Sequence, residues 1–384
     1  MYLIFFLLYI TCWAQPLQVE IQSRSAVMIN AETGVILFSK EPHQRAFPAS
    51  TTKVVTALLL LDREEIDLAQ KISVSREALR YKPLNKNDPA HWLESNSTTI
   101  GLRVGEVVTL ETLLYGMMLP SGNDAANVIA ETCGNGSIAS FIEQMNSYLK
   151  QIGCQNTHFM NPHGLYHPDH YTTAYDLALI ARRAMQFPLF RQAVGSLAYH
   201  KPATNKQPGV TLYQTNPLLK KSHRFYYPKA IGIKTGYTLL AQNTYLAAAT
   251  HEGRTLIIAL LGSEARDGRF MDARSLFDAA FAEKLTKHTF FEPGSLFHRP
   301  LQGRKSSLQA HLAKQIALSY YPSEELQCRI FVRWLSLPLP IQQGQKVGEV
   351  QILTQEDHVL AQGDLLSDQE VTPTLFERVR QLFR

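Results

Sequence analysis

The feature that most constrains the fold is an almost unbroken apolar run that starts just after a serine and a lysine. Residues 50–61 read Ser-Thr-Thr-Lys-Val-Val-Thr-Ala-Leu-Leu-Leu-Leu, and past Lys53 the side chains are nearly all apolar. A helix that is apolar all round has to be buried inside a sizeable domain. The sequence therefore predicts a central helix whose first turn carries Ser50 and Lys53.

The chain is long enough to surround such a helix. Its 384 residues suggest two domains, and its composition is that of a folded globular protein. The formal net charge is +5, with Lys and Arg scattered along the chain. A nucleic-acid-binding surface normally shows clustered cations, so no nucleic-acid partner is predicted.

Segments with strand and helix patterns occur in blocks between residues 25 and 283. The expected elements are a hairpin at 25–39, helices at 109–118, 124–133 and 267–283, and strands at 244–249 and 255–261. Hairpins next to a helical block indicate an α/β (α+β) fold. We assign this larger domain to residues 15–285.

A smaller β-rich domain is expected at residues 290–370, where short strand-like runs occur at 330–336, 346–353 and 359–365. The last segment, 373–384, has the pattern of an amphipathic helix. Its apolar face comprises Leu375, Phe376, Val379, Leu382 and Phe383, and Arg378, Arg380 and Arg384 lie elsewhere. This pattern predicts peripheral binding to an anionic membrane surface, and packing on the β-rich domain is the alternative.

The N-terminus is an apolar stretch that ends in Cys12-Trp13-Ala14, a small-x-small cleavage pattern. We predict a signal peptide at residues 1–14, export, and a place at the periplasmic face of the cytoplasmic membrane. A buried N-terminal strand is the alternative. Cleavage would leave Cys133, Cys154 and Cys328, and we favour buried thiols over a bond between Cys133 and Cys154.

Three short motifs follow one another along the chain: Ser50-Thr-Thr-Lys53, Ser121-Gly-Asn123 and Lys234-Thr-Gly236. This order of S-x-x-K, S-x-N and K-T-G is typical of penicillin-binding proteins and β-lactamases. The first motif alone is weak, because Ser147-Tyr-Leu-Lys150 also matches it. The surrounding helix separates the two matches, since only the first is apolar all round.

A Ser and a Lys three residues apart share one face of a helix, so the hydroxyl and the amine can meet. At the head of a buried helix, burial and the nearby Lys234 both disfavour the Lys53 ammonium and lower its pKa. We therefore predict Ser50 as the nucleophile, with Lys53 as its base. The alternative for Ser50 is a simple helix cap.

The other two motifs supply groups that suit a peptide substrate. Ser121 can relay a proton, and the Asn123 amide can both donate and accept hydrogen bonds, although Ser-Gly-Asn is most often only a turn. The K-T-G motif follows a strand-like run and is expected on an edge strand, with Gly236 leaving room for a ligand. The cation of Lys234 and the hydroxyl of Thr235 suit a terminal carboxylate.

Longer segments around these motifs resemble the low-molecular-mass D-alanyl-D-alanine carboxypeptidases, which are penicillin-binding serine peptidases. The matching segments are 47–53, 115–126, 161–165, 172–176 and 232–238. The resemblance implies a β-lactamase/transpeptidase-like fold, peptidoglycan stem peptides as substrates and covalent binding of β-lactams. It also implies acylation of Ser50, Lys53 as proton acceptor, Ser121 as catalytic relay, Asn123 and residues 234–237 in substrate binding, and an oxyanion hole from the backbone of Ser50 and Tyr237.

Other functions compete with this one. A DD-endopeptidase acting on cross-links would share every motif. A β-lactamase of class A needs a glutamate between the second and third motifs, and none occurs between Gln144 and His251. A binding-only protein would show a damaged motif set. The histidines at 158, 163, 167 and 170 match no helical zinc motif, so neither a metal nor a cofactor is predicted.

Overall fold

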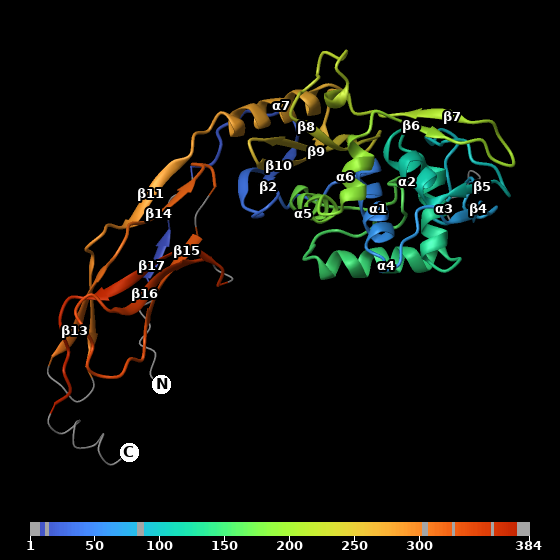
Figure 1. Cartoon of the computed structure of the whole chain (residues 1–384). Coiled ribbons are helices and arrows are strands. Elements are labelled where there is room, and N and C mark those ends of the chain that lie inside the picture. The colour runs from blue at the N-terminus through green and yellow to red at the C-terminus, as the bar shows by residue number, and fades with distance from the viewer. Residues whose placement is uncertain are drawn as a thin grey trace. The chain divides into compact units, whose positions relative to one another are not determined.

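The computed structural model describes residues 8–11, 15–82, 88–301, 306–324, 327–354 and 357–374. The chain forms two compact units, one of residues Leu17–Ala282 and one of Met1–Pro16 together with Glu283–Arg384 (Figure 1). The larger unit mixes helices and strands, and the smaller one is rich in strands. This arrangement confirms the predicted fold class.

A five-stranded antiparallel sheet with the order β3-β2-β10-β9-β8 forms the centre of the larger unit. Its strands are β2 (Ser25–Asn30), β3 (Ile36–Lys40), β8 (Ala230–Thr238), β9 (Gln242–His251) and β10 (Arg254–Ser263). The expected hairpin at 25–39 is the β2–β3 pair. The K-T-G motif lies on β8, which is an edge strand as predicted.

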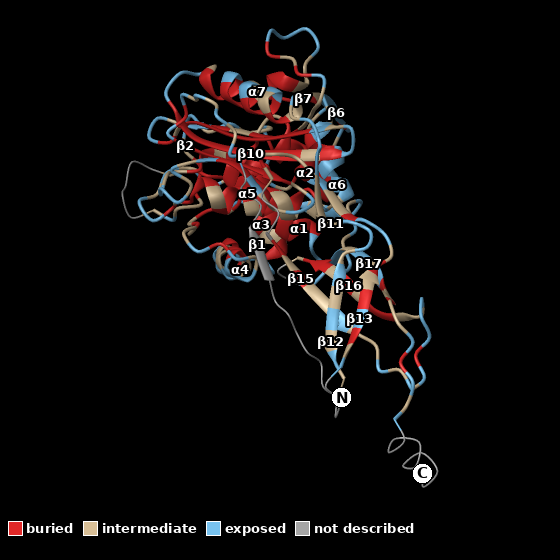
Figure 2. Cartoon of the chain, turned by 90° about the vertical axis from the view of Figure 1, so that its left-hand side faces the viewer, coloured by how far each residue is buried: buried red, intermediate tan, exposed pale blue. Residues whose placement is uncertain are grey.

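Both faces of this sheet are buried, and alternate residues of each strand point to opposite faces. In β2, Val27 and Ile29 join the core shared with most of the helices, whereas Ala26 and Met28 join a second core with α7 (Gly268–Phe281). In Figure 2 the central part of the sheet is in the colour of buried residues, and β2, β9 and β10 are buried along most of their length. Burial of one large aliphatic side chain contributes about 1.5–3 kcal/mol, so the sheet is a rigid base for the motifs that it carries.

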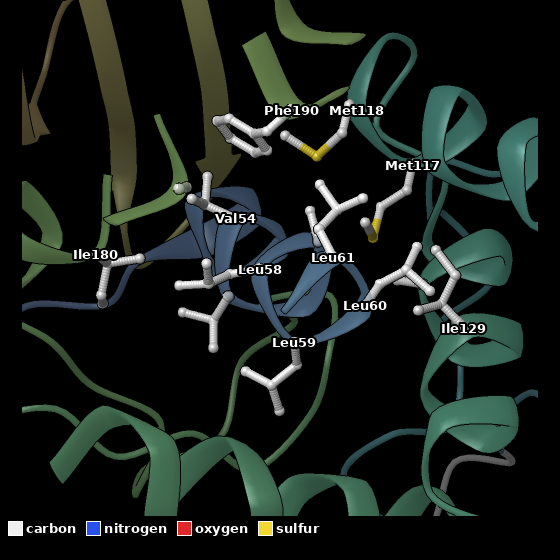
Figure 3. Packing of buried hydrophobic residues seen from close by; sticks show 14 of the residues in the cluster. Val54, Leu58, Leu59, Leu60, Leu61, Met117, Met118, Ile129, Ile180 and Phe190 are labelled. Carbon is white, nitrogen blue, oxygen red and sulfur yellow. The ribbon is translucent and has the colours of Figure 1, made fainter. Parts of the chain in front are cut away.

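The predicted central helix is present as α1 (Lys53–Leu61), and every residue in it is buried. In Figure 3 its leucines are surrounded by Met117 and Met118, Ile129, Ile180 and Phe190, which come from four other helices. The preceding turn, η1 (Ala49–Thr52), is a 3-10 helix rather than the α-helical first turn expected from the sequence. Ala49 has a positive φ of 49°, so the chain enters this turn through a sharp bend.

The larger unit also contains five further α-helices and one short 3-10 helix. They are α2 (Leu110–Met118), α3 (Asn123–Cys133), α4 (Ile138–Gln151), α5 (Ala174–Ala184), α6 (Pro188–Gly195) and the 3-10 helix η2 (Pro217–Leu219). Two short hairpins complete the unit: β4 (Lys71–Ser73) with β5 (Val107–Thr109), and β6 (Ala198–Lys201) with β7 (Val210–Tyr213). A fully buried ion pair, Lys201 Nζ to Glu106 Oε1 at 2.8 Å, ties the second hairpin to the loop before β5.

The smaller unit contains a six-stranded sheet with the order β1-β15-β16-β17-β13-β12 and a separate pair, β11-β14. The strands are β1 (Leu8–Thr11), β11 (Thr286–Phe291), β12 (Leu296–Pro300), β13 (Ser307–Leu312), β14 (Ile316–Tyr320), β15 (Gln327–Trp334), β16 (Lys346–Leu353) and β17 (Val359–Ser367). Three of these strands match the runs expected from the sequence. Strands β11, β12, β13 and β14 have only five or six residues each, and few of these are buried, so their apolar patterns were weak.

The two ends of the chain differ in what the structure describes. Residues Leu8–Thr11 pair with Gln327–Ile330 of β15, which is the strand alternative for this segment. A cleaved leader at 1–14 stays a prediction, and its removal would leave β15 at the edge of the sheet. The predicted amphipathic helix falls mainly on residues 375–384, outside the described residues. No described helix is both long and apolar enough to cross a membrane.

Candidate active site

Ser50 and Lys53 lie side by side where η1 passes into α1. Lys53 Nζ is 3.0 Å from Ser50 Oγ, as the three-residue spacing predicted. Two further acceptors hold the amine, Asn123 Oδ1 at 2.6 Å and the carbonyl oxygen of His163 at 2.7 Å. A neutral amine can donate to these two oxygens and direct its lone pair at the Ser50 hydroxyl. The geometry therefore fits an amine that removes a proton from Ser50.

The electrostatics of the site favour that neutral amine. Lys53 is fully buried, and burial followed by the positive charge of Lys234 lowers its pKa well below the ordinary lysine value. The carboxylate of Asp124 opposes this shift but does not reverse it. Both causes expected from the sequence act in the predicted direction.

The Ser-Gly-Asn segment forms the turn between α2 and α3. Ser121 has a φ of 75°, and its half-buried hydroxyl makes no hydrogen bond within the described parts of the chain. Asn123 is the first residue of α3 and bonds Lys53 directly, so its amide has a role beside the expected substrate contact. The next residue, Asp124, accepts the backbone N–H groups of Ile100 and Leu102. These bonds fix the segment that follows Ser97 and Thr98, two residues that line the cleft over Ser50.

The loop of residues 161–165 was part of the resemblance, but no sequence pattern predicted its position. Asn161 folds the loop by accepting the N–H of Gly164 at 2.7 Å and donating to the carbonyl of Leu165 at 2.9 Å. The fold directs the His163 carbonyl at Lys53. A Cβ on Gly164 would lie 1.9 Å from the Ala49 oxygen, so only glycine fits against the turn that carries Ser50.

The K-T-G residues lie on β8 beside the same turn. Lys234 is buried, and its Nζ donates to the Thr235 carbonyl at 2.9 Å. Burial and the charge of Arg269 lower the pKa of Lys234 to about 7. Gly236 is tightly packed: a Cβ there would meet Thr244 Oγ1 at 2.3 Å and the Ser50 nitrogen at 2.9 Å. The missing side chain therefore leaves room for the Thr244 side chain and the Ser50 backbone, and a role of Gly236 in substrate binding stays a prediction.

A cleft of about 540 Å³ opens over Ser50. Asn123 and His163 line it, and Tyr237, which is 61% exposed, lies at its rim. The apolar side chains of Leu239 and Leu240 are also exposed there. Glu94, which no sequence motif includes, contributes a carboxylate to the wall.

Arg269 could not be singled out from the sequence, because it lies far along the chain in an unremarkable helical segment. It is the second residue of α7 and is 8% exposed. Its Nη1 donates to the carbonyls of Gly236 at 2.6 Å and Thr244 at 3.2 Å, so it clamps β8 to β9 behind the K-T-G residues. Burial lowers the pKa of this guanidinium to about 10.

The buried histidines and cysteines have structural surroundings. His163 Nε2 contacts the His91 carbonyl at 3.0 Å, and His170 is held by the Met160 N–H and the Thr52 hydroxyl. Among the described residues, no three His, Cys, Asp or Glu side chains gather as a metal site. Cys133 and Cys154 are buried free thiols, which confirms the preferred prediction.

Comparison with known proteins agrees with this geometry. A family model described as D-alanyl-D-alanine carboxypeptidase matches residues 11–265. The D-alanyl-D-alanine carboxypeptidase of Streptomyces sp. strain K15 is 35% identical over 263 residues, covering 66% of this chain and 85% of that protein. The carboxypeptidase DacF of Bacillus subtilis is 28% identical over 358 residues, covering 91% and 86%.

Solved structures give the same result. The Streptomyces K15 DD-transpeptidase aligns with a TM-score of 0.61 at 32% identity, covering 69% of this chain and 99% of that one. A D-alanyl-D-alanine carboxypeptidase from Mycobacterium tuberculosis aligns with a TM-score of 0.60 at 29% identity, covering 71% and 96%. This chain belongs to the D-alanyl-D-alanine carboxypeptidase family, peptidase family S11.

Proposed function

We propose that this protein removes the terminal D-alanine from peptidoglycan pentapeptide stems through an acyl-enzyme on Ser50, and that penicillin acylates the same serine. The observation that carries the proposal is the contact of 3.0 Å between Ser50 Oγ and the amine of Lys53. A serine needs an adjacent base to become a nucleophile. Here that base is buried, its pKa is lowered, and two further acceptors align it.

In the acylation step, Lys53 takes the hydroxyl proton as Ser50 Oγ attacks the carbonyl carbon of the penultimate D-alanine. The tetrahedral intermediate then collapses, the peptide C–N bond breaks, and the leaving amine takes up a proton. The half-buried hydroxyl of Ser121 is the proposed relay for this proton. Water attacks the Ser50 ester in the second step, with Lys53 again as base, and releases the shortened peptide.

Two groups of donors support these steps. The backbone N–H groups of Ser50 and Tyr237 are the proposed oxyanion hole. Gly236 packs closely on the Ser50 nitrogen, so the turn that carries Ser50 lies against the strand that carries Tyr237. The terminal carboxylate is assigned to Lys234 and the Thr235 hydroxyl, with Arg269 holding their strand in place. Asn123 also lines the cleft, where its amide can contact the peptide.

The β-lactamase alternative depends on rapid hydrolysis of the acyl-enzyme by a carboxylate. Glu94 is a carboxylate on the cleft wall, but it precedes the second motif and contacts Lys82 Nζ at 3.6 Å. We therefore assign hydrolysis to Lys53 and expect a penicillin adduct that persists.

Incubation with a muramyl pentapeptide followed by mass spectrometry tests the proposal. We expect a tetrapeptide and one equivalent of free D-alanine, with no product from a peptide that ends in L-alanine. Equal cleavage of the two peptides, or cleavage of neither, would contradict a D-alanyl-D-alanine carboxypeptidase.

For localisation we propose export followed by peripheral attachment through residues 373–384. The support is the sequence pattern of five apolar residues and three arginines, which suits weak, reversible binding to anionic lipid. Deletion of 373–384 should release the protein from anionic vesicles in sedimentation, with penicillin acylation unchanged. A truncated protein that still pellets with the vesicles would refute the attachment.

A further inference from the structure

A second pocket, of about 560 Å³, lies beside the K-T-G strand and carries an excess of positive charge. Four of its lining side chains are cationic and one is a carboxylate. The cationic residues are Lys220, Arg224, Arg266 and Arg269, and the carboxylate belongs to Asp267. Such a lining favours an anionic ligand.

The positive charges are only partly neutralised by the protein. Asp267 forms its ion pair with Arg224. Within the described ranges, Lys220 and Arg266 have no carboxylate at ion-pair distance. Arg269 is buried, and its Nε has no hydrogen-bond partner in the described part of the chain. A buried guanidinium nitrogen without a partner marks a place where an acceptor is missing.

The pocket adjoins the position of the leaving residue. Thr235 of the K-T-G motif lines it, and the Thr235 hydroxyl is 3.1 Å from that of Thr215, which lines it as well. Under the proposed function, Thr235 faces the carboxylate of the residue that leaves. A side chain longer than that of alanine on the leaving residue can then enter the pocket that Thr235 shares with Lys220 and Arg266.

We infer that this pocket binds a second carboxylate, carried by the side chain of the leaving D-amino acid. The inference rests on the proposed function and adds a substrate class to it. This class comprises peptides whose leaving residue carries a carboxylate on its side chain, including cross-linked peptides with such a residue at the bond that is cut. Lys220 and Arg266 supply the charge, and they are not part of the machinery for D-alanine release.

The test uses peptides with one common acyl part that end in D-alanine, D-glutamate or D-lysine. For the wild-type protein we expect kcat/KM to be about tenfold higher with D-glutamate than with D-lysine. The double variant Lys220→Gln/Arg266→Gln should lower this ratio about threefold to tenfold and leave release of D-alanine unchanged. Lys221→Gln is the matched control, because Lys221 is exposed but does not line the pocket.

An unchanged ratio in the double variant would overturn the inference, as would a wild-type protein that prefers D-lysine. Wild-type protein that cleaves none of the three peptides would instead contradict the proposed function itself. Release of D-alanine alone, with D-glutamate peptides left intact, overturns only the second carboxylate site.

Discussion

Two Ser-x-x-Lys pairs lie in the larger unit, and only one of them has the surroundings of a catalytic pair. Ser50 and Lys53 lie at the head of α1, where Lys53 is fully buried and bonded to three oxygens. Ser147 and Lys150 lie near the end of α4, and both are exposed. The spacing is the same, so the difference in chemistry comes from burial and from the charges and acceptors near the amine.

The neighbours of each helix explain this difference. Every residue of α1 is buried because other elements surround it, so the amine of Lys53 cannot be hydrated and its pKa falls. In α4 only Ile138, Phe141, Met145 and Leu149 are buried, on one face of the helix. Its opposite face remains in water. An apolar run that continues on all sides is therefore a better sign of a reactive lysine than the motif itself.

Among the tests of this comparison, removal of the Lys53 amine should have the largest effect on the acylation rate. Lys53→Ala should slow acylation by labelled penicillin about 10²- to 10⁴-fold, because no other group in the described part of the chain contacts Ser50 Oγ as a base. Stopped-flow or gel measurement of labelling gives the rate. Lys150→Ala is the control and should acylate at the wild-type rate. Wild-type acylation by the Lys53 variant would mean that the base lies elsewhere.

The packing behind the serine can be tested with two glycines of similar φ. Gly164 (φ 94°) abuts the Ala49 oxygen, whereas a Cβ added to Gly153 (φ 89°), just after α4, would meet nothing within 4 Å. Gly153→Ala should lose only about 1–2 kcal/mol of unfolding free energy, from backbone strain, and should acylate normally. Gly164→Ala should lose more and acylate at least about tenfold more slowly, because a shift of the Ala49–Ser50 backbone disturbs the oxyanion hole.

Denaturant unfolding and acylation rates measured on both glycine variants check this expectation. Equal effects of the two substitutions would show that the contact between Gly164 and Ala49 does not matter for the site.

A smaller effect is expected when the positive charge beside the site is removed. Lys53 acts as a base only above its own lowered pKa, and the charge of Lys234 helps to keep that pKa low. Lys234→Ala should therefore shift the rising limb of the profile of acylation rate against pH to higher pH. It should also raise KM about tenfold for a peptide that ends in a free carboxylate. In the wild type, Lys234 loses its charge above about pH 7, so carboxylate recognition should weaken as the pH rises.

Profiles of kcat/KM against pH for the wild type and the Lys234 variant distinguish these effects. Identical rising limbs in the two proteins would contradict the electrostatic coupling between Lys234 and Lys53.

The sequence was informative about the larger unit because its signals are local. The apolar run of residues 54–61, the hairpin at 25–39 and the edge strand before Lys234 all follow from short patterns. Groups brought together from distant parts of the chain were not predictable. The His163 carbonyl accepts from Lys53, and Arg269 donates to the carbonyl of Gly236. Both contacts involve the backbone, so the residue types alone do not predict them. Gly236 indicated a close approach, and in the structure Thr244 Oγ1 and the Ser50 nitrogen lie close to it.

The most direct test of the central claim is to locate a penicillin adduct. Wild-type protein is acylated, digested and analysed by tandem mass spectrometry, together with Ser50→Ala and Ser147→Ala variants. We expect one adduct, on Ser50, in the wild type and in the Ser147 variant, and none in the Ser50 variant. An adduct on Ser147, or undiminished labelling of Ser50→Ala, would contradict the assignment of Ser50 as the nucleophile.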